Sequence, residues 1–177
     1  MFETLHPPYK VIYADPPWNY RDKHRGHGGA EDHYATMTTD ETCMLDVEDL
    51  VDRDALLFLW ATFPNLPEAL QVMHYWGFTY KTQAFTWIKT YPRNGKPVMG
   101  MGSYTRSNAE VCLLGLKGRK WNLARNVSSV IIAPRGQHSA KPPEVRERIV
   151  QLCGDVPRVE LFARERVPGW DCWGLEV

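Results

Sequence analysis

The chain has 177 residues, 44% of them hydrophobic and 24% charged, and its formal net charge at pH 7 is zero. These proportions are ordinary for a globular domain with a sizeable core, and no apolar run reaches the about 20 residues of a membrane-spanning helix. The first residues also lack the basic and apolar segments of a secretory signal, so we expect one cytoplasmic domain over residues 1–177 without membrane contact.

Short apolar and aromatic runs predict six strands, which are residues 9–14, 55–62, 80–90, 110–118, 127–133 and 158–163. Three helices are expected between them, with Thr or Pro near their starts and, in the last two, a closing Gly; they span residues 38–50, 66–77 and 141–154. Segments rich in Gly and Pro predict loops over residues 18–35 and 91–107.

The alternation of strands and helices predicts an α/β fold. Several of the strands are apolar throughout, which is typical of a mostly parallel sheet with helices on both faces. Ligands of such sheets bind outside the carboxyl ends of the strands. Asp15 directly follows the first predicted strand and Arg164 directly follows the last, so we expect both at one binding edge.

Charge is unevenly distributed along the chain. Between Glu31 and Glu68 there are ten acids and one base, whereas between Lys81 and Arg125 there are nine bases and one acid. The basic half is interleaved with tyrosines and tryptophans, which suits nucleic acid because cations neutralise phosphates and aromatic rings stack on bases. A solvated basic face is the alternative interpretation of the same pattern.

Cysteines and histidines predict neither a disulfide nor a metal site. The four cysteines are far apart and form no C-x-x-C pair, as expected of free thiols in a reducing cytosol: Cys43, Cys112, Cys153 and Cys172. His24, His27 and His33 lie in a Gly-rich segment without a cysteine partner, so we expect no metal.

The sequence ADPPW, ending at Trp18, leaves the first predicted strand in an unusual way. Pro16 and Pro17 fix their own φ angles and lack an N–H group, and Pro16 keeps Asp15 out of the helical region. The segment should therefore be extended and stiff, with its carbonyl oxygens and the Asp15 carboxylate as acceptors beside the flat Trp18 ring. Adenine, whose exocyclic amine carries two hydrogens, fits such a slot. A proline-rich turn without a ligand is the alternative.

An adenine slot of this kind also suits a reaction. The adenine amine is a poor nucleophile because its lone pair is delocalised into the ring. Acceptors on both hydrogens favour a more tetrahedral nitrogen that can attack a sulfonium methyl group in line, so that positioning carries most of the rate. Asp15 need not be a strong base, because the amine becomes acidic only after methylation.

The chain resembles the DPPW-type adenine N6-methyltransferases, a family that includes messenger-RNA adenine methyltransferases and small bacterial and phage DNA methyltransferases. The resemblance rests on ADPPW, HYATMTTDE, LLFLWAT, WGF, TWIKT, EVCLLGLKG, HSAKPPE and VELFAR, followed by GWDCWG, in the family's order over nearly the whole chain. It implies a Rossmann-like, circularly permuted methyltransferase fold, with the catalytic motif before the cofactor motif. It also implies the cofactor S-adenosyl-L-methionine and a bacterial or phage-infected cell.

The resemblance assigns roles to particular residues. The catalytic motif is Asp15, Pro16, Pro17 and Trp18. The expected cofactor-binding residues are Asp15, Lys141, Glu160, Phe162, Arg164 and Glu176, of which Lys141 matches the lysine that pairs with the methionine carboxylate. On the substrate side, Tyr34 and Trp60 match aromatic positions at the entrance and Glu110 matches an acid near the catalytic strand. Leu175 departs from the family, which often has Asn there.

A separate target-recognition domain is not expected, so the loops at 19–34 and 91–108, or a helper subunit, must recognise the target. We expect Tyr20, Lys89, Arg93 and Arg106, in or beside these loops, to contact the substrate. The leading hypothesis is methylation of adenine N6 in DNA. The alternatives are the same reaction on RNA, a non-catalytic partner subunit, or a small-molecule methyltransferase. A homodimer is also compatible with the sequence.

Overall fold

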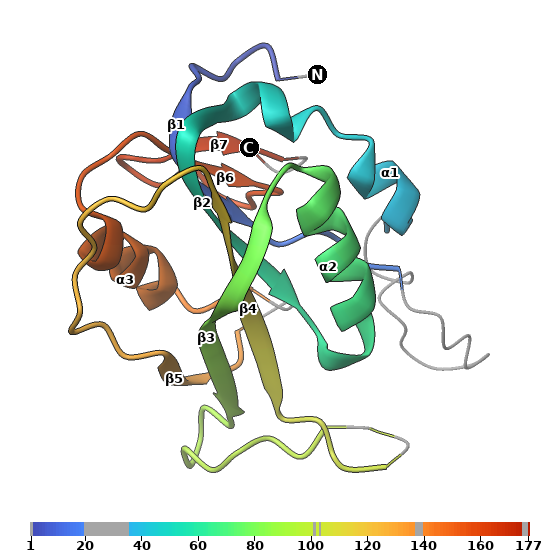
Figure 1. The fold of residues 1–177 in the computed structure, drawn as a ribbon. Helices are drawn as coiled ribbons and strands as arrows, with labels where there is room; N and C mark the ends of the chain where they lie inside the picture. The colour runs from blue at the N-terminus through green and yellow to red at the C-terminus, as the bar shows by residue number, and fades with distance from the viewer. Residues whose placement is uncertain (1, 20–35, 101, 103, 137–139, 175–176) are drawn as a thin grey trace.

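The computed structural model of the protein describes residues 2–19, 36–100, 102, 104–136, 140–174 and 177. Its centre is one twisted sheet of seven strands (Figure 1). The strands are β1 (Tyr9–Ala14), β2 (Val51–Ala61), β3 (Thr79–Thr90), β4 (Ala109–Lys117), β5 (Val130–Pro134), β6 (Arg158–Leu161) and β7 (Asp171–Trp173).

The strand order is β5-β3-β4-β2-β1-β6-β7. All neighbouring pairs are parallel except those of β4, which runs antiparallel to both β2 and β3. The predicted mostly parallel α/β sheet is therefore confirmed. β4 is the exception because it follows β3 through the loop at 91–108 and returns beside it. The short β7 was not predicted, since three residues are too few for a periodic pattern.

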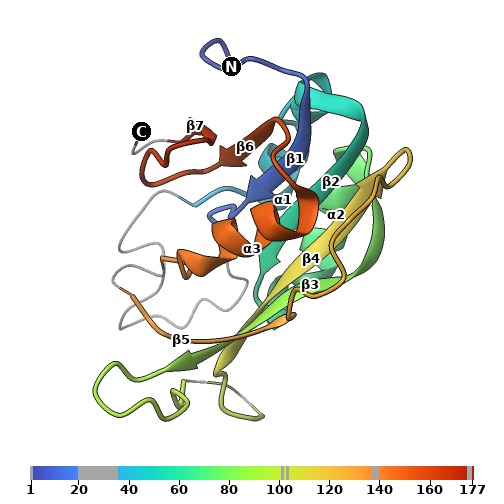
Figure 2. The same cartoon turned by 90° about the vertical axis from the view of Figure 1, so that its left-hand side faces the viewer.

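Among the described residues, three α-helices cover the two faces of the sheet, as predicted: α1 (Thr39–Cys43), α2 (Leu66–Tyr75) and α3 (Glu144–Cys153). Figure 2 shows α3 in front of the sheet, with α1 and α2 behind it. The predicted helix over 38–50 is instead a short α1 followed by a 3-10 turn at Val47–Leu50. Acidic residues in this second half, Asp46, Glu48 and Asp49, oppose the negative end of a longer helix dipole.

Strand β2 contributes to both hydrophobic cores, which explains why its sequence is apolar without interruption. Leu57, Leu59 and Ala61 pack with α1 and α2, whereas Leu56, Phe58 and Trp60 belong to the core that α3 covers. Successive side chains of a strand point to opposite faces, so both sets must be apolar when both faces are covered. None of the described helices is long and apolar enough to cross a membrane.

Helix α1 begins with a capping box, which gives the first testable prediction. The Thr38 hydroxyl accepts from the Glu41 N–H (3.2 Å), and the Glu41 carboxylate accepts from the Thr38 N–H (2.8 Å). We expect Thr38→Ala to lower the free energy of unfolding by about 1 kcal/mol, because a side-chain cap is lost. Thermal unfolding should show a Tm lower by about 2–4 °C. Thr39→Ala is the matched control, and an equal Tm for both variants would contradict the cap.

Candidate active site

The carboxyl edge of the sheet brings four charged side chains from distant parts of the chain together. Asp15 directly follows β1, and Glu110 is near the start of the antiparallel β4, so both lie at this edge. Lys141, which precedes α3, places its Nζ 2.6 Å from Asp15 Oδ2 and 3.3 Å from Glu110 Oε2. Lys89 of β3 contacts the other Glu110 oxygen. The result is a mostly buried cluster in which acidic and basic side chains alternate.

Burial and pairing set the protonation of this cluster. Burial raises the pKa of Asp15, and the nearby Lys141 ammonium opposes that rise. Burial also acts to raise the pKa of Glu110, but Lys141 and Lys89 hold it below its usual value. Burial would lower the pKa of Lys141, yet its two carboxylate neighbours hold that pKa above the usual value. Lys141 is therefore a fixed cation beside Asp15.

The backbone of the DPPW segment differs from the sequence-based expectation in one respect. The Pro16 and Pro17 carbonyls were expected to be unused acceptors, but each already accepts a backbone N–H. Trp18 N–H donates to Pro16 O (2.8 Å) and Met37 N–H donates to Pro17 O (2.9 Å). These bonds hold the segment in place. A carbonyl oxygen has two lone pairs, so each of these oxygens can accept a second hydrogen bond. The expected contact with an amine therefore stays a prediction.

The tryptophans of the site are more deeply buried than the sequence suggested. Trp18 is 7% exposed, and its indole N–H donates to the Trp60 carbonyl (2.9 Å). Trp60, expected at the entrance, is fully buried; its indole N–H donates to the Tyr13 hydroxyl (2.8 Å). The Lys141 ammonium lies 5.5 Å from the centre of the Trp60 ring. In this structure Trp60 forms the apolar floor beneath Lys141, and a contact with substrate stays a prediction.

A pocket of about 180 Å³ adjoins Asp15 and gathers all the described residues that were expected to bind the cofactor. It is lined by Tyr13, Asp15, Ala140, Lys141, Arg146, Glu160, Phe162, Arg164 and Glu165. The pairing of Ala14 with Leu161 explains the convergence, since it sets Asp15 and Phe162 side by side at the ends of β1 and β6. Glu176 lies outside the described residues.

The charges in this pocket fit one part of S-adenosylmethionine. Three cations and three carboxylates line it, which suits the carboxylate and ammonium of an amino acid and the hydroxyl groups of a ribose. Pockets that enclose a whole drug-sized ligand have volumes of roughly 300–1,000 Å³. The pocket therefore has room for the methionine or ribose part, and the adenine would extend beyond it.

Sequence reasoning did not identify Arg146 as part of the site. A carboxylate in an apolar strand, such as Glu160, is costly to bury without a partner. Arg146 supplies that partner with two hydrogen bonds, from Nε to Oε2 (2.6 Å) and from Nη2 to Oε1 (2.9 Å). Tyr13, which is buried and lines the pocket, was also missed, because its position in the sequence is that of an ordinary core residue of β1.

Two of the residues expected to contact nucleic acid, Arg93 and Arg106, lie on a long β3–β4 arm, which projects beyond the rest of the sheet in Figure 1. Arg93 and Arg106 are exposed in the loop that joins the two strands, and Tyr104 in the same loop is fully exposed. Lys89 belongs to the charged cluster instead, and its Nζ lies 5.2 Å from the Trp87 ring centre. Tyr20, Tyr34 and the three histidines at 24, 27 and 33 lie outside the described residues.

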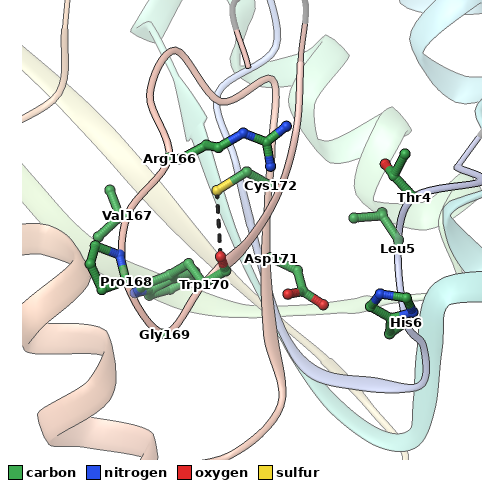
Figure 3. A pocket seen from close by; sticks show the side chains of 10 residues that line it. All are labelled: Thr4, Leu5, His6, Arg166, Val167, Pro168, Gly169, Trp170, Asp171 and Cys172. Atoms are coloured by element: carbon green, nitrogen blue, oxygen red, sulfur yellow. Dashed lines mark hydrogen bonds between the residues drawn. The ribbon is translucent and has the colours of Figure 1, made fainter.

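A larger pocket, of about 480 Å³, lies at the opposite edge of the sheet, where β1 and β7 begin (Figure 3). Figure 3 shows the loop from Arg166 to Trp170 on one side and the segment from Thr4 to His6 on the other. The Asp171 carboxylate near its centre already accepts from the Tyr9 hydroxyl. Size alone therefore does not select the site, whereas the smaller pocket beside Asp15 has converging charged groups.

The chain is similar in sequence to one protein family and to several methyltransferases. A family model described as MT-A70 matches residues 9–176. The type II methyltransferase M.MunI of Mycoplasma sp is 36% identical, with 96% of this chain and 78% of that protein covered. The N(6)-adenosine-methyltransferase MT-A70-like protein of Drosophila melanogaster is 33% identical, with 96% and 27% covered. The N(6)-adenosine-methyltransferase catalytic subunit METTL3 of Homo sapiens is 31% identical, with 96% and 28% covered. The chain thus spans little more than a quarter of these two eukaryotic relatives.

Proposed function

The chain belongs to the MT-A70 family, whose methyltransferases depend on S-adenosylmethionine, and we propose that it methylates the N6 amine of adenine in DNA. The observation that carries the proposal is the contact between Lys141 and Asp15 at 2.6 Å, at the mouth of the charged pocket. This contact joins the DPPW segment to a lysine that can bind the carboxylate of an amino acid. The cofactor predicted from the sequence is confirmed by the family.

The described residues suggest how the reaction proceeds. A bound cofactor would supply an electrophilic methyl group, so that a C–N bond would form at the adenine amine as a C–S bond of the sulfonium breaks. Asp15 and the Pro16 carbonyl would accept hydrogen bonds from the amine and orient its lone pair. Lys141 would hold the cofactor carboxylate near Asp15. After transfer, the amine nitrogen carries an extra proton, which Asp15 can accept and pass to water.

Two considerations favour DNA over RNA. Over 96% of this chain, the identity to a type II methyltransferase is 36%, compared with 33% and 31% to the two adenosine methyltransferases. The sequence also resembles the small DNA-modifying members of the family. RNA is the second candidate, supported by the names of the eukaryotic relatives. A helper subunit or a second copy of the chain could contribute to target recognition, since an adenine in a duplex must be flipped out to reach Asp15.

The circular permutation also belongs to the proposal. β1, which leads into the DPPW segment, comes first in the chain, while β6, which leads into the cofactor pocket, comes near the end. The two strands are nevertheless hydrogen-bonded neighbours in the sheet. This arrangement is what a catalytic motif placed before the cofactor motif would produce.

Transfer of a radiolabelled methyl group tests the choice of substrate. Purified protein and labelled cofactor are incubated with pools of random-sequence duplex DNA, single-stranded DNA and RNA. We expect incorporation into DNA at least tenfold above that into RNA, with the label in N6-methyladenine after digestion. Preferential labelling of RNA would contradict the DNA proposal and leave the adenine chemistry in place.

The exposed arginines of the β3–β4 arm predict a salt effect. Arg93→Ala and Arg106→Ala should each weaken nucleic-acid binding and reduce the slope of log affinity against log salt by about 1, because each arginine releases counterions from a phosphate. Fluorescence anisotropy between 50 and 200 mM salt measures this, and Arg53→Ala, exposed at β2, is the control. Unchanged slopes for both arm variants would show that the arm does not contribute to nucleic-acid binding.

A further inference from the structure

The guanidinium of Arg146 binds both ends of the turn that forms one wall of the cofactor pocket. Two of its nitrogens donate to Glu160, at the end of β6, and Nη1 donates to Glu165 Oε1 (3.1 Å). Glu160 precedes Phe162 by two residues and Glu165 follows it by three. A single side chain of α3 therefore spans the whole turn from 160 to 165.

This turn has an unfavourable backbone conformation. Phe162 has a φ of 62°, the left-handed region that L-residues with a side chain rarely adopt. Such a conformation persists where its surroundings enforce it, and it is frequent at ligand sites. On one side, the Phe162 ring packs against Trp173 (5.5 Å) and Ala163 N–H donates to Trp173 O (3.0 Å). On the other side, the restraint is Arg146.

Glu160 also depends on Arg146 for its charge. Its side chain is 9% exposed, and a carboxylate so buried is costly without a paired cation. Burial raises the pKa of Glu160, the Arg146 guanidinium opposes the rise, and the charges of Asp15 and Glu165 add to it. Tyr13, Lys141 and Arg164 line the same pocket. Without Arg146, burial and the charges of Asp15 and Glu165 would raise the pKa of Glu160 further.

We propose that Arg146 is a positioning residue of the cofactor site, which keeps Glu160 a carboxylate facing the pocket and fixes the 160–165 turn. Glu160 then presents acceptor oxygens to the hydroxyl or ammonium donors of the cofactor. The inference rests on the proposed function, because it concerns the same cofactor pocket. Arg146 lies outside the DPPW, HSAKPPE and VELFAR motifs, yet it organises one wall of that pocket.

Binding of S-adenosylhomocysteine tests the role of Arg146 without requiring methyl transfer. Isothermal titration calorimetry compares the wild type with Arg146→Gln at pH 6.5 and pH 8.5. We expect the variant to bind at least about tenfold more weakly at pH 6.5, because one partner of a buried charge pair is gone. The deficit should be smaller at pH 8.5, because a higher pH favours the ionised form of Glu160. Arg148→Gln, on the same helix but bonded to the Ser128 and Val130 carbonyls, is the control and should bind normally.

A second variant covers the case in which Arg146→Gln does not fold. Arg146→Gln with Glu160→Gln also removes the buried carboxyl group that has lost its partner, so this variant should fold and bind weakly at both pH values. Wild-type affinity of either variant, or an Arg146→Gln deficit that is equal at both pH values, would overturn the inference and leave the proposed function standing. A wild-type protein that does not bind S-adenosylhomocysteine would instead refute the proposed function, and the inference with it.

Discussion

Replacing Asp15 with alanine is expected to lower the rate of adenine methylation by a factor of about 100–1,000, the loss typical when a group that stabilises a transition state is removed. Asp15 lies between the two halves of the site, directly after β1 and 2.6 Å from the Lys141 ammonium. Its loss removes an acceptor for the amine and leaves the nucleophile poorly oriented. Initial rates with saturating cofactor and DNA measure the effect.

The fold should survive this change, so the loss can be assigned to chemistry. Lys141 keeps its contact with Glu110 at 3.3 Å in the absence of Asp15, and its charge therefore stays paired. We expect a Tm within a few degrees of the wild type. Asp15→Asn keeps one acceptor oxygen and should retain more activity than the alanine variant. An alanine variant with a tenth or more of the wild-type rate would rule out Asp15 as the central residue.

Lys141→Met is expected to have the largest effect on stability. The substitution leaves Asp15 and Glu110 as neighbouring buried carboxyls without the cation they share. Removal of one partner from a buried ion pair typically costs about 3–5 kcal/mol. Cofactor binding should be lost as well, because the carboxylate of the amino acid loses its counter-charge. Thermal unfolding and calorimetry measure the two effects separately.

The pH dependence of Lys141→Met follows from the same geometry. Glu110 keeps its contact with Lys89, but without the Lys141 ammonium, burial and the nearby Glu110 charge leave the pKa of Asp15 further above its value of about 4 in the unfolded chain. The folded variant then binds a proton at Asp15 that the unfolded chain has lost, so the contribution of Asp15 to stability falls as the pH rises through its raised pKa. The Tm deficit relative to the wild type should therefore be larger at pH 8 than at pH 5.

A surface pair provides the control for this prediction. Lys117 binds Glu48 at 3.0 Å, but the Glu48 side chain is 66% exposed. Lys117→Met should cost less than about 1 kcal/mol at any of these pH values, as is usual for exposed ion pairs. Equal losses for the two lysines, or a Lys141→Met deficit that grows toward acid pH, would contradict the buried charge cluster.

Local sequence patterns were sufficient to predict most of the fold. The uninterrupted apolar run in β2 indicated a strand covered on both faces, and Leu57 and Phe58 do pack into two different cores. Thr38 and Glu41 indicated the start of α1. Asp15 and Arg164 were placed at the same edge because they follow parallel strands. In each case the information lies in a few consecutive residues or in one simple rule of sheet topology.

The features that sequence reasoning missed depend on contacts between distant residues. The pairing of Arg146 with Glu160 joins a helix to a strand, and the sequence of neither segment indicates which residue of the other it contacts. The complete burial of the Trp60 side chain is a second case, because an aromatic residue at a strand end can line the entrance of a site or fill the core. The occupied Pro16 and Pro17 carbonyls are a third, since their donors are set by the folded backbone.

One measurement in cells tests most directly whether this chain methylates adenine in DNA through Asp15. The protein is expressed in a host that lacks adenine methylation, and N6-methyladenine is quantified by mass spectrometry in digested DNA and digested RNA. We predict N6-methyladenine in the DNA of cells with the wild-type protein, and none above background with Asp15→Ala. Its absence from both nucleic acids, or an unchanged amount with Asp15→Ala, would contradict the account.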